Sequence, residues 1–512
     1  MFLITVIIGV LLIVLYYYGK RNHSYWKSKG VKYEKPLIFF GSTLKNKIKN
    51  VCFSERFVDM YREYHNEKFV GFFDGNRPSL LIRDPDIVQH ILINDFRNFH
   101  YRGANAHKEV TEPLMKNLFN VDGDTWKLVR QRITPAFTGA KLKAMFPLIV
   151  EQAEKLLEII EGFAKTEKEI DSREILARYT TDFIGACGFG INVDSQNDAN
   201  SEFRELGRLI FTVSKRDVFV SILKRIAPNI FKSLHFFSHK VERLSMNLIK
   251  YIMAQRYYKP IGRNDFIDMM LALKAKGKIV AESLEKRKAD GSVEIVELEI
   301  DDELIVAQVV VFFAAGFETS SSSSSYLLHL FALNPEKQKR CQQEIDKVLS
   351  RYNGKLCFDA VKEMKYLEMC FKEALRLYSP VGWLQRRCAN RCRIPGTDLI
   401  IDEGVDIVIS VQAMHTDDKY FDNPDEFLPE RFDPDHVGQI RNSVYLPFGS
   451  GPRACIGERL GILQSLVGVA AVLSQFSVAP SKNTVLRPKL DPTSITVSTI
   501  IGGLPLLFTK RQ

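Results

Sequence analysis

The loop PFGSGPRACIG, from Pro447 to Gly457, holds one cysteine among three glycines, two prolines and an arginine. Loops this rich in glycine and proline are usually solvated turns, and a cysteine beside one is usually an inert small hydrophobe. Here an apolar run, residues 456–476, follows directly and predicts a helix with Cys455 at its amino end. Unpaired N–H groups and the helix dipole at such an end stabilise a thiolate.

A loop that presents a single thiolate to the protein interior indicates a metal ligand. Zinc and iron–sulfur clusters need several protein ligands, whereas haem iron can take one thiolate. Only Cys388 and Cys392 lie close together in the sequence, and no second pair stands at zinc-finger spacing. The residues therefore favour haem iron at Cys455.

The charge pattern argues against a nucleic-acid-binding protein. The 512 residues carry 71 Lys and Arg against 61 Asp and Glu, a net charge of +10, but the basic residues are dispersed and no DNA- or RNA-reading motif is present. A membrane surface or an acidic protein partner suits this charge better. No repeat or internal boundary divides the chain, so we expect one large catalytic unit.

The cysteines are scattered instead of standing at the spacings of a disulfide framework. This usage indicates a reducing compartment. The eight positions are Cys52, Cys187, Cys341, Cys357, Cys370, Cys388, Cys392 and Cys455.

The amino-terminal segment predicts a membrane anchor. Eighteen uncharged residues, 2–19, precede Lys20 and Arg21, and that length can just cross a hydrocarbon core of about 30 Å. A cleaved signal peptide would carry its basic residues before a shorter apolar run. Basic residues stay cytosolic, so the amino terminus should face the lumen. We expect a transmembrane anchor at 2–19, a linker at 20–36 and a haem-thiolate catalytic domain at 37–512.

Beyond the anchor the sequence is mostly helical, with a smaller β component. Strand-like runs occur at 79–82, 399–401 and 405–411 and near the carboxyl terminus. The charge-rich segment 274–299 lacks helical periodicity and is expected to be an exposed connection. The segment 206–237 mixes Phe, Ile and Leu with Lys and Arg, which suits either a membrane-interface stretch or ordinary core packing.

The longest helical signal begins at Asp301, a capping residue, and continues to Asn334, where Pro335 follows. The run is apolar nearly all round, which implies burial and makes its serines costly unless they are hydrogen-bonded. Ser and Thr hydroxyls can bond back to the carbonyl four residues earlier. The alternative is a local opening near Gly316 that frees a hydroxyl and a carbonyl to hold water.

Five sequence motifs together resemble the cytochrome P450 family. FxxGxRxCxG matches at Phe448, Gly451, Arg453, Cys455 and Gly457, and WxxxR at Trp126 and Arg130. AGx(D/E)T matches at Ala315, Gly316, Glu318 and Thr319, ExxR at Glu373 and Arg376, and PERF at Pro429 to Phe432, which includes Arg431. DFRNFHYRG, TPAFTGAKLK and AGFETSSSS look most like insect microsomal members related to the vertebrate drug-metabolising group. The resemblance implies the mainly α fold with a smaller β subdomain.

The resemblance also implies roles for residues of this chain. Cys455 would be the axial thiolate of haem b, within a cofactor site that also includes Phe448 and Gly457. Trp126, Arg130, Arg386 and Arg453 would bind the haem propionates. Thr319 with Glu318 would relay protons, and Glu373, Arg376 and Arg431 would form a buried structural network. The substrate pocket would be lined by Phe312, Ala315, Val381, Leu384 and Ile501, of which Phe312 could equally be core.

The implied activity is that of a monooxygenase that uses O₂. It would act on lipophilic substrates, either xenobiotics such as insecticides and plant toxins or endogenous lipids and hormones. The chain has no nucleotide-binding motif, so NADPH electrons would come through NADPH-cytochrome P450 reductase, with cytochrome b5 as a possible second partner. The implied location is the endoplasmic reticulum membrane, with the catalytic domain in the cytosol. A docking face for the reductase, or else only solvated charge, is offered by Lys127, Arg132, Lys141, Lys143, Arg441 and Arg459.

Two other functions fit the same motifs. A haem-thiolate isomerase or dehydratase would need no reductant, and a haem-based sensor or carrier would form no product. The intact Glu318–Thr319 pair argues against the isomerase. Three departures from the family pattern stand out: the proline-rich hinge is reduced to Pro36, Ser379 replaces a proline, and Leu460 replaces an aromatic residue or methionine.

Overall fold

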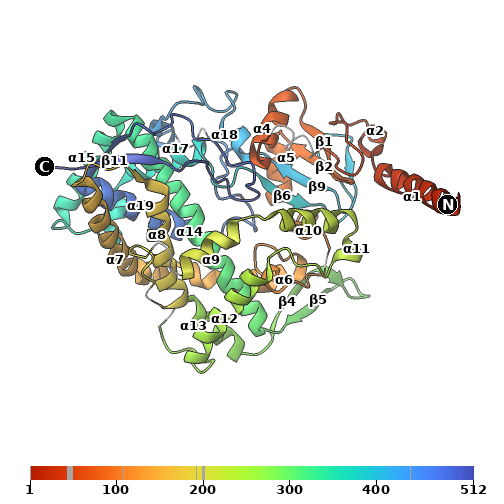
Figure 1. Ribbon diagram of the computed structural model, residues 1–512, viewed down its shortest axis with the longest axis horizontal. Helices are drawn as coiled ribbons and strands as arrows, with labels where there is room; N and C mark the ends of the chain where they lie inside the picture. Colours follow the sequence, from red (N-terminus) through yellow and green to blue (C-terminus); the bar gives the residue numbers. More distant parts are fainter. Residues whose placement is uncertain are drawn as a thin grey trace.

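The computed structural model describes residues 2–42, 50–107, 109–191, 193–198, 202–263, 265–436, 438 and 440–512. A large helical part and a smaller part built on a β-sheet lie side by side (Figure 1). Each part has its own buried apolar core, one around the central helix α14 and one around the sheet. The predicted mainly helical fold with a smaller β component is confirmed.

Helix α14, Asp302–Leu333, runs through the middle of the helical part. The Asp301 carboxylate accepts a hydrogen bond from the Leu304 N–H at 2.7 Å and so caps its amino end. Helices α8 (Ser172–Ile184), α17 (Lys365–Leu377) and α19 (Glu458–Gln475) pack against it. The helix is continuous, so the opening considered near Gly316 does not occur.

Four of the buried serines of α14 are satisfied because their hydroxyls bond back to carbonyls of the same helix, whereas the Ser322 hydroxyl has no partner among the described residues. Ser323 donates to the Thr319 carbonyl at 2.7 Å and Ser324 to the Ser320 carbonyl at 2.9 Å. Ser321 and Ser325 donate to the carbonyls three residues earlier at 3.1 and 2.9 Å. These bonds satisfy groups that would otherwise be costly to bury.

The main sheet has the strand order β1-β2-β9-β6. Strands β1 (Phe69–Asp74) and β2 (Arg77–Ile82) form an antiparallel hairpin, β2 pairs in parallel with β9 (Asp406–Ile409), and β9 pairs antiparallel with β6 (Leu384–Arg387). Smaller sheets join β10 (Phe476–Pro480), β11 (Pro505–Lys510) and β3 (Ile170–Asp171), and β7 (Cys392–Arg393) with β8 (Ile400–Ile401). The strands predicted from the sequence all form, although β9 is shorter than its apolar run.

The segment 274–299 is largely exposed, as expected of a connection, and most of it has regular structure. It forms an antiparallel hairpin of β4 (Ile279–Arg287) and β5 (Val293–Leu298). The hairpin is anchored to α6 because the Asp124 carboxylate accepts hydrogen bonds from the Ser283 hydroxyl and the Leu284 N–H at 2.6 and 2.5 Å. The hairpin is exposed to solvent and carries many charged side chains, so its composition does not indicate strands.

Residues 20–36, expected to be a linker, pack against the main sheet. Trp26 is fully buried, and its indole N–H donates to the Phe72 carbonyl at 3.0 Å. Glu34 forms a buried ion pair with Arg56. This segment therefore belongs structurally to the domain and fixes where the amino-terminal helix leaves it.

Helix α1, Phe2–Lys20, extends away from the rest of the molecule (Figure 1). Among the described residues, α14 is the one helix that meets the length and hydropathy of a membrane span, and 72% of its apolar stretch is buried in the protein. That burial identifies α14 as a core helix. The anchor predicted at α1 stays a prediction.

The remaining helices complete the helical part and the edges of the sheet. They are α2 (Tyr25–Ser28), α4 (Phe53–Glu63), α5 (Pro85–Gln89), α6 (Gly123–Ile133), α7 (Gly139–Ala164), α9 (Glu202–Phe211), α10 (Lys215–Ile226), α11 (Pro228–Phe231), α12 (His239–Gln255), α13 (Phe266–Ala275), α15 (Pro335–Arg351), α16 (Phe358–Glu363) and α18 (Val411–His415), with short 3₁₀ or π turns at His90–Asn94, Pro113–Met115, Thr134–Phe137, Gly185–Phe189 and Pro429–Phe432.

Candidate active site

The loop before α19 is folded tightly around Cys455. The Cys455 N–H donates to the Phe448 carbonyl at 2.8 Å and the Ala454 N–H to the Gly451 carbonyl at 2.9 Å. Gly451 has a φ of 74°, and a Cβ there would lie 1.9 Å from the Leu92 carbonyl oxygen. Only glycine fits such a position, because it tolerates positive φ and has no side chain. Cys455 is thus held at a fixed point just before α19 begins.

The Cys455 thiol combines surface accessibility with desolvation by the surrounding protein. Its side chain is exposed, yet burial among protein atoms is the main influence on its pKa, which is raised. The Gly457 N–H and the charges of Arg130 and Arg102 act in the opposite direction. The helix-end N–H thus favours the thiolate as expected, although burial acts more strongly in the opposite direction.

Ala315 and Thr319 of α14 are the next part of the predicted site. Ala315 is exposed although most of the helix around it is buried. The Thr319 hydroxyl donates to the Ala315 carbonyl at 2.7 Å. A Cβ on Gly461 would lie 3.7 Å from the Ser320 hydroxyl, so α19 approaches α14 closely at this level. Cys455 precedes α19, and the Ala315–Thr319 turn lies on α14, the helix that α19 packs against.

Four arginines surround the Cys455 side of the site: Arg102, Arg130, Arg386 and Arg453. Burial lowers the pKa of Arg453 to about 9 and that of Arg102 to about 10, although Asp122 partly compensates both. Burial and repulsion from Arg102 and Arg453 lower the pKa of Arg386 well below its usual value. Positive charge therefore exceeds the negative charge that the chain places among these residues.

Several donors of these arginines have no partner among the described residues. They are the Nε atoms of Arg102 and Arg386 and one Nη of Arg453. The other bonds of Arg453 go to the His100 carbonyl at 2.6 Å, the Val121 carbonyl at 3.1 Å and Asp122 at 2.7 Å. Buried unpaired donors are rare in folded proteins. Free donors and surplus positive charge beside a cysteine fit a haem, whose two propionates are anionic.

Trp126 and Arg130 lie one turn apart on α6 as predicted from their spacing. The guanidinium of Arg453 lies 4.5 Å from the centre of the Trp126 ring, close enough for a cation–π contact. Sequence reasoning missed Arg102. The Arg102 guanidinium lies 4.1 Å from the centre of the Phe119 ring, and the backbone N–H of Arg102 donates to the Asp122 carboxylate at 2.6 Å. The HYRG stretch, residues 100–103, is the part of the sequence that could have indicated Arg102 as a site residue.

Glu373, Arg376 and Arg431 form a buried network. Arg376 binds both carboxylate oxygens of Glu373 at 2.7 and 2.8 Å, and Arg431 reaches the same carboxylate at 3.4 Å. Further Arg376 donors bond to the carbonyls of His415, Pro424 and Glu426. Because both members of the central pair are fully buried and fully bonded, the network joins α17 to the chain that leads into the Cys455 loop.

His415 extends this network. Its Nε2 accepts a hydrogen bond from the Leu446 N–H at 2.8 Å, and burial with the nearby Arg376 charge lowers its pKa to about 3. The ring is therefore neutral. Ser379, the residue in place of a familiar proline, lies 3.3 Å from His415 Nδ1 and donates to the Leu375 carbonyl at 2.9 Å. The serine is thus absorbed by local hydrogen bonds.

Glu318 does not point at Thr319. Its carboxylate forms an ion pair with Arg173 of α8 and is nearly buried. A relay that includes both Glu318 and Thr319 therefore requires this ion pair to open. Arg173 had no signal in the sequence, because it lies 145 residues away and in no motif.

The residues predicted to line a substrate pocket differ in their surroundings. Phe312 stacks on Phe266 with ring centres 4.5 Å apart and so also serves as core. Leu384 packs near Gly449 of the cysteine loop, and a Cβ there would lie 3.7 Å from it. Ile501 is 55% exposed, and Val381 is partly buried. Their role in a pocket stays a prediction.

Comparison with known proteins agrees with this geometry. A family model described as Cytochrome P450 matches residues 31–503. The chain belongs to the cytochrome P450 family. It is 37% identical to Cytochrome P450 6B7 of Helicoverpa armigera over 99% of this chain and 98% of that protein. It is 35% identical to Cytochrome P450 6a2 of Drosophila melanogaster over 98% of both chains, and 35% identical to Cytochrome P450 6k1 of Blattella germanica over 99% of this chain and 96% of that one.

Membership settles the reaction class. The protein is a haem-thiolate monooxygenase that uses O₂ and NADPH-derived electrons and acts on xenobiotic or endogenous compounds. The isomerase and the sensor considered from the sequence are thereby set aside. The family implies a redox partner such as a reductase, and substrates that are lipophilic.

Proposed function

We propose that Cys455 is the axial ligand and that Arg102, Arg130, Arg386 and Arg453 with Trp126 hold the haem propionates. The observation that carries this proposal is the set of arginine donors near Cys455 that have no partner among the described residues. Phe448 and Gly457 hold the thiol by main-chain contacts.

The Soret band of the dithionite-reduced protein under carbon monoxide tests the ligand. A thiolate-ligated spectrum is expected for the wild type, and Cys455→Ala should lose it. An imidazole-type spectrum in the wild type, or an unchanged spectrum and turnover in Cys455→Ala, would refute the assignment.

Haem, when bound, supplies oxygen activation and insertion of one oxygen atom into a C–H bond. The chain's task is to deliver protons and exclude other reactions. Thr319 holds a hydroxyl proton on the Ala315 carbonyl, and rotation of this hydroxyl would free both groups to bind a water. Glu318, once released from Arg173, would pass protons to that water. Thr319 is therefore the proton-delivering residue, and Arg173 positions Glu318.

We propose that the substrate pocket is formed by Phe312, Ala315, Val381, Leu384 and Ile501. These side chains are apolar, so they favour lipophilic compounds, among which insecticides, plant toxins and endogenous lipids or hormones all qualify. Replacing Ala315 by Phe should block space beside Thr319 and change the spectrum of accepted compounds. Products from a panel of lipophilic compounds, incubated with reductase and NADPH and identified by mass spectrometry, are the measurement.

We propose that α1 is a transmembrane anchor in the endoplasmic reticulum, with the catalytic domain in the cytosol. Many of its apolar side chains are exposed, and Lys20 and Arg21 follow the apolar run. The Tyr18 hydroxyl donates to the Ile226 carbonyl at 2.7 Å, which ties the helix to α10. Phe219 of α10 and Ile230 of α11 are 60% and 73% exposed. Membrane fractionation of a chain lacking residues 2–19 tests the anchor.

We propose that NADPH-cytochrome P450 reductase docks on basic residues near the haem motifs, with cytochrome b5 as a second partner of the same face. Arg132, Lys143, Arg441 and Arg459 are exposed. Lys127 and Arg132 also bond to carbonyls of β4 at 2.7 and 3.2 Å, and Arg441 pairs with Asp86 at 2.6 Å. Arg459 is thus the best single probe, and Arg459→Glu should slow reduction by the reductase while leaving dithionite reduction unchanged. Lys141 belongs to the same predicted face.

A further inference from the structure

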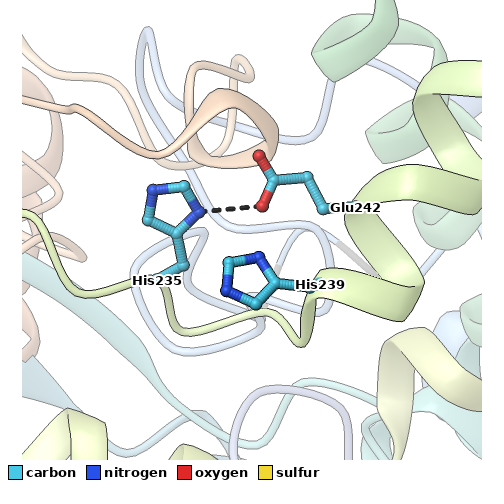
Figure 2. A group of neighbouring side chains, drawn as sticks. All are labelled: His235, His239 and Glu242. Carbon is cyan, nitrogen blue, oxygen red and sulfur yellow. Dashed lines mark hydrogen bonds and ion pairs between the residues drawn. The ribbon is translucent and has the colours of Figure 1, made fainter.

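Three metal-binding side chains converge where the chain enters α12, away from the cysteine loop. His235 lies in the preceding loop, and His239 and Glu242 lie in the first turns of the helix. Figure 2 shows the two imidazoles and the carboxylate turned toward one another. One ligand atom from each can be chosen so that all three lie within 4.8 Å of one another. His235 Nδ1 and the Glu242 carboxylate are already 2.8 Å apart.

The loop that carries His235 is held in place from several sides. The His235 carbonyl accepts a hydrogen bond from Arg216 at 2.9 Å, and the Leu234 carbonyl accepts one from Lys224 at 2.7 Å. The next two N–H groups, those of residues 236 and 237, donate to the Glu112 carboxylate at 2.8 Å each. Glu112 is buried and lies 3.5 Å from Lys224. The position of His235 is therefore fixed by its backbone before any ligand arrives.

The other two ligands stand on a regular helix. Ser238 caps α12 and accepts a hydrogen bond from the Val241 N–H at 3.4 Å, so His239 and Glu242 lie three residues apart on one face of its first turns. His239 is exposed, and no hydrogen bond to its ring nitrogens is present in the described part of the chain. A rigid pair of ligands, one of them open to solvent, faces a loop ligand.

We propose that His235, His239 and Glu242 form a zinc site. Two imidazoles and one carboxylate suit Zn²⁺, with water in the fourth position. Bonds of about 2.0–2.2 Å place tetrahedral ligand atoms about 3.4 Å apart. Ligand atoms within 4.8 Å of one another therefore need to close by at most about 1.4 Å, while the His235–Glu242 pair at 2.8 Å needs to open slightly. The positive end of the helix opposes a cation, and the Glu242 carboxylate offsets that effect. This site is independent of the haem chemistry.

Zinc at this place would join the loop after α11 to the start of α12. The loop also carries the bonds to Arg216 and Lys224 of α10, so the metal would fasten α10 and α12 to each other. Helices α10 and α11 carry the exposed Phe219 and Ile230. The structure thus assigns the metal a stapling role at the apolar edge of the domain.

The test is zinc binding by the full-length holoenzyme after dialysis against a chelator. Calorimetric titration with Zn²⁺ should show one site, and X-ray absorption at the zinc edge should show nitrogen and oxygen ligands at about 2.0–2.2 Å. His239→Ala should weaken binding by at least about tenfold, because even the loss of an outer hydrogen-bond partner costs 10–100-fold. Since His239 is exposed, this variant should fold, and the reduced carbon monoxide spectrum checks that.

His65→Ala is the matched control, because His65 is also exposed and lies outside the site. It should bind zinc as the wild type does. Hydrogen exchange in the loop before α12 should slow with zinc in the wild type and not in His239→Ala. Equal zinc affinity in His239→Ala and wild type, or no zinc binding at all, would overturn the proposal. So would sulfur ligands at about 2.3 Å, which would place the metal at Cys388 and Cys392, whose sulfurs are 3.8 Å apart.

Discussion

Replacing Arg386 by methionine should move two measurements in opposite directions. Arg386 is 2% exposed. Among the described residues it donates one hydrogen bond, to the neighbouring Gln385 carbonyl at 2.7 Å, and its Nε has no partner there. Its charge is repelled by Arg102 and Arg453. In the haem-free protein the buried charge of Arg386 lowers the free energy of unfolding. Replacing buried ion pairs by apolar side chains of similar size often raises that free energy by about 1–4 kcal/mol. Urea unfolding of haem-depleted Arg386→Met should therefore show a higher midpoint than wild type.

Haem retention should fall in the same variant. A hydrogen bond between a charged donor and a propionate contributes about 1.5–3 kcal/mol, which corresponds to about a 10- to 150-fold change in affinity. The rate of haem transfer to an excess of a haem-scavenging protein measures the loss. Arg386 then behaves as a residue that binds an anion and not as part of the core.

Arg387→Met is the matched control on the same strand. Arg387 is already paired, with its Nε 2.7 Å from Asp406 and another donor 2.8 Å from the Gly103 carbonyl. Removing one partner of a buried pair costs about 3 kcal/mol, so this variant should unfold earlier while its haem transfer rate stays within about threefold of wild type. If Arg386→Met unfolds earlier and keeps its haem as well as wild type does, the anion-binding assignment of the arginines is wrong.

Three further outcomes follow from the site. Thr319→Ala should lower the rate of product formation by at least about 100-fold, the lower end for a lost proton-transfer group. NADPH consumption with product analysis measures this loss, and normal coupling of NADPH consumption to product would contradict the proton role. His415 has a pKa of about 3 in the folded protein and about 6.5 when unfolded, so the unfolded state takes up the extra proton between these values. Stability should then fall by about 2 kcal/mol from pH 7.5 to 5, and urea titrations should show this loss in wild type but not in His415→Gln. Gly451→Ala should cost about 2–5 kcal/mol, because its Cβ meets the Leu92 carbonyl at 1.9 Å, and a haem content equal to wild type would contradict that clash.

Local sequence patterns predicted the parts of the site that lie within one loop or helix. The loop before Cys455 could be interpreted because glycine spacing and a following apolar run are both local. The pair Trp126 and Arg130 lies on one helix face, and Glu373 with Arg376 does too. In each case the spacing along the chain nearly fixes the spacing in space.

The partners that were missed lie on other elements. Arg173 reaches Glu318 from a different helix, and Arg102 joins the arginine cluster from a loop. The hairpin at 279–298 was not predicted because charged side chains on both of its faces mask the alternation of apolar and polar residues. The packing of residues 20–36 on the sheet was not predicted because Trp26, its fully buried side chain, lies in a largely polar stretch of sequence. Such contacts depend on how distant elements meet, which no local pattern encodes.

The arginines near Cys455 affect the pKa of its thiol. Arg102 and Arg130 lower the pKa of the thiol, yet burial keeps it above its usual value. The same two arginines belong to the group that we assign to the propionates. Once their charge is balanced by propionate, their support for a thiolate weakens. The chain by itself therefore presents a neutral thiol, and a thiolate at Cys455 depends on the positive charge of a bound metal, which deprotonates a coordinating thiol. Formation of the sulfur–iron bond should thus release a proton, and haem affinity should rise with pH.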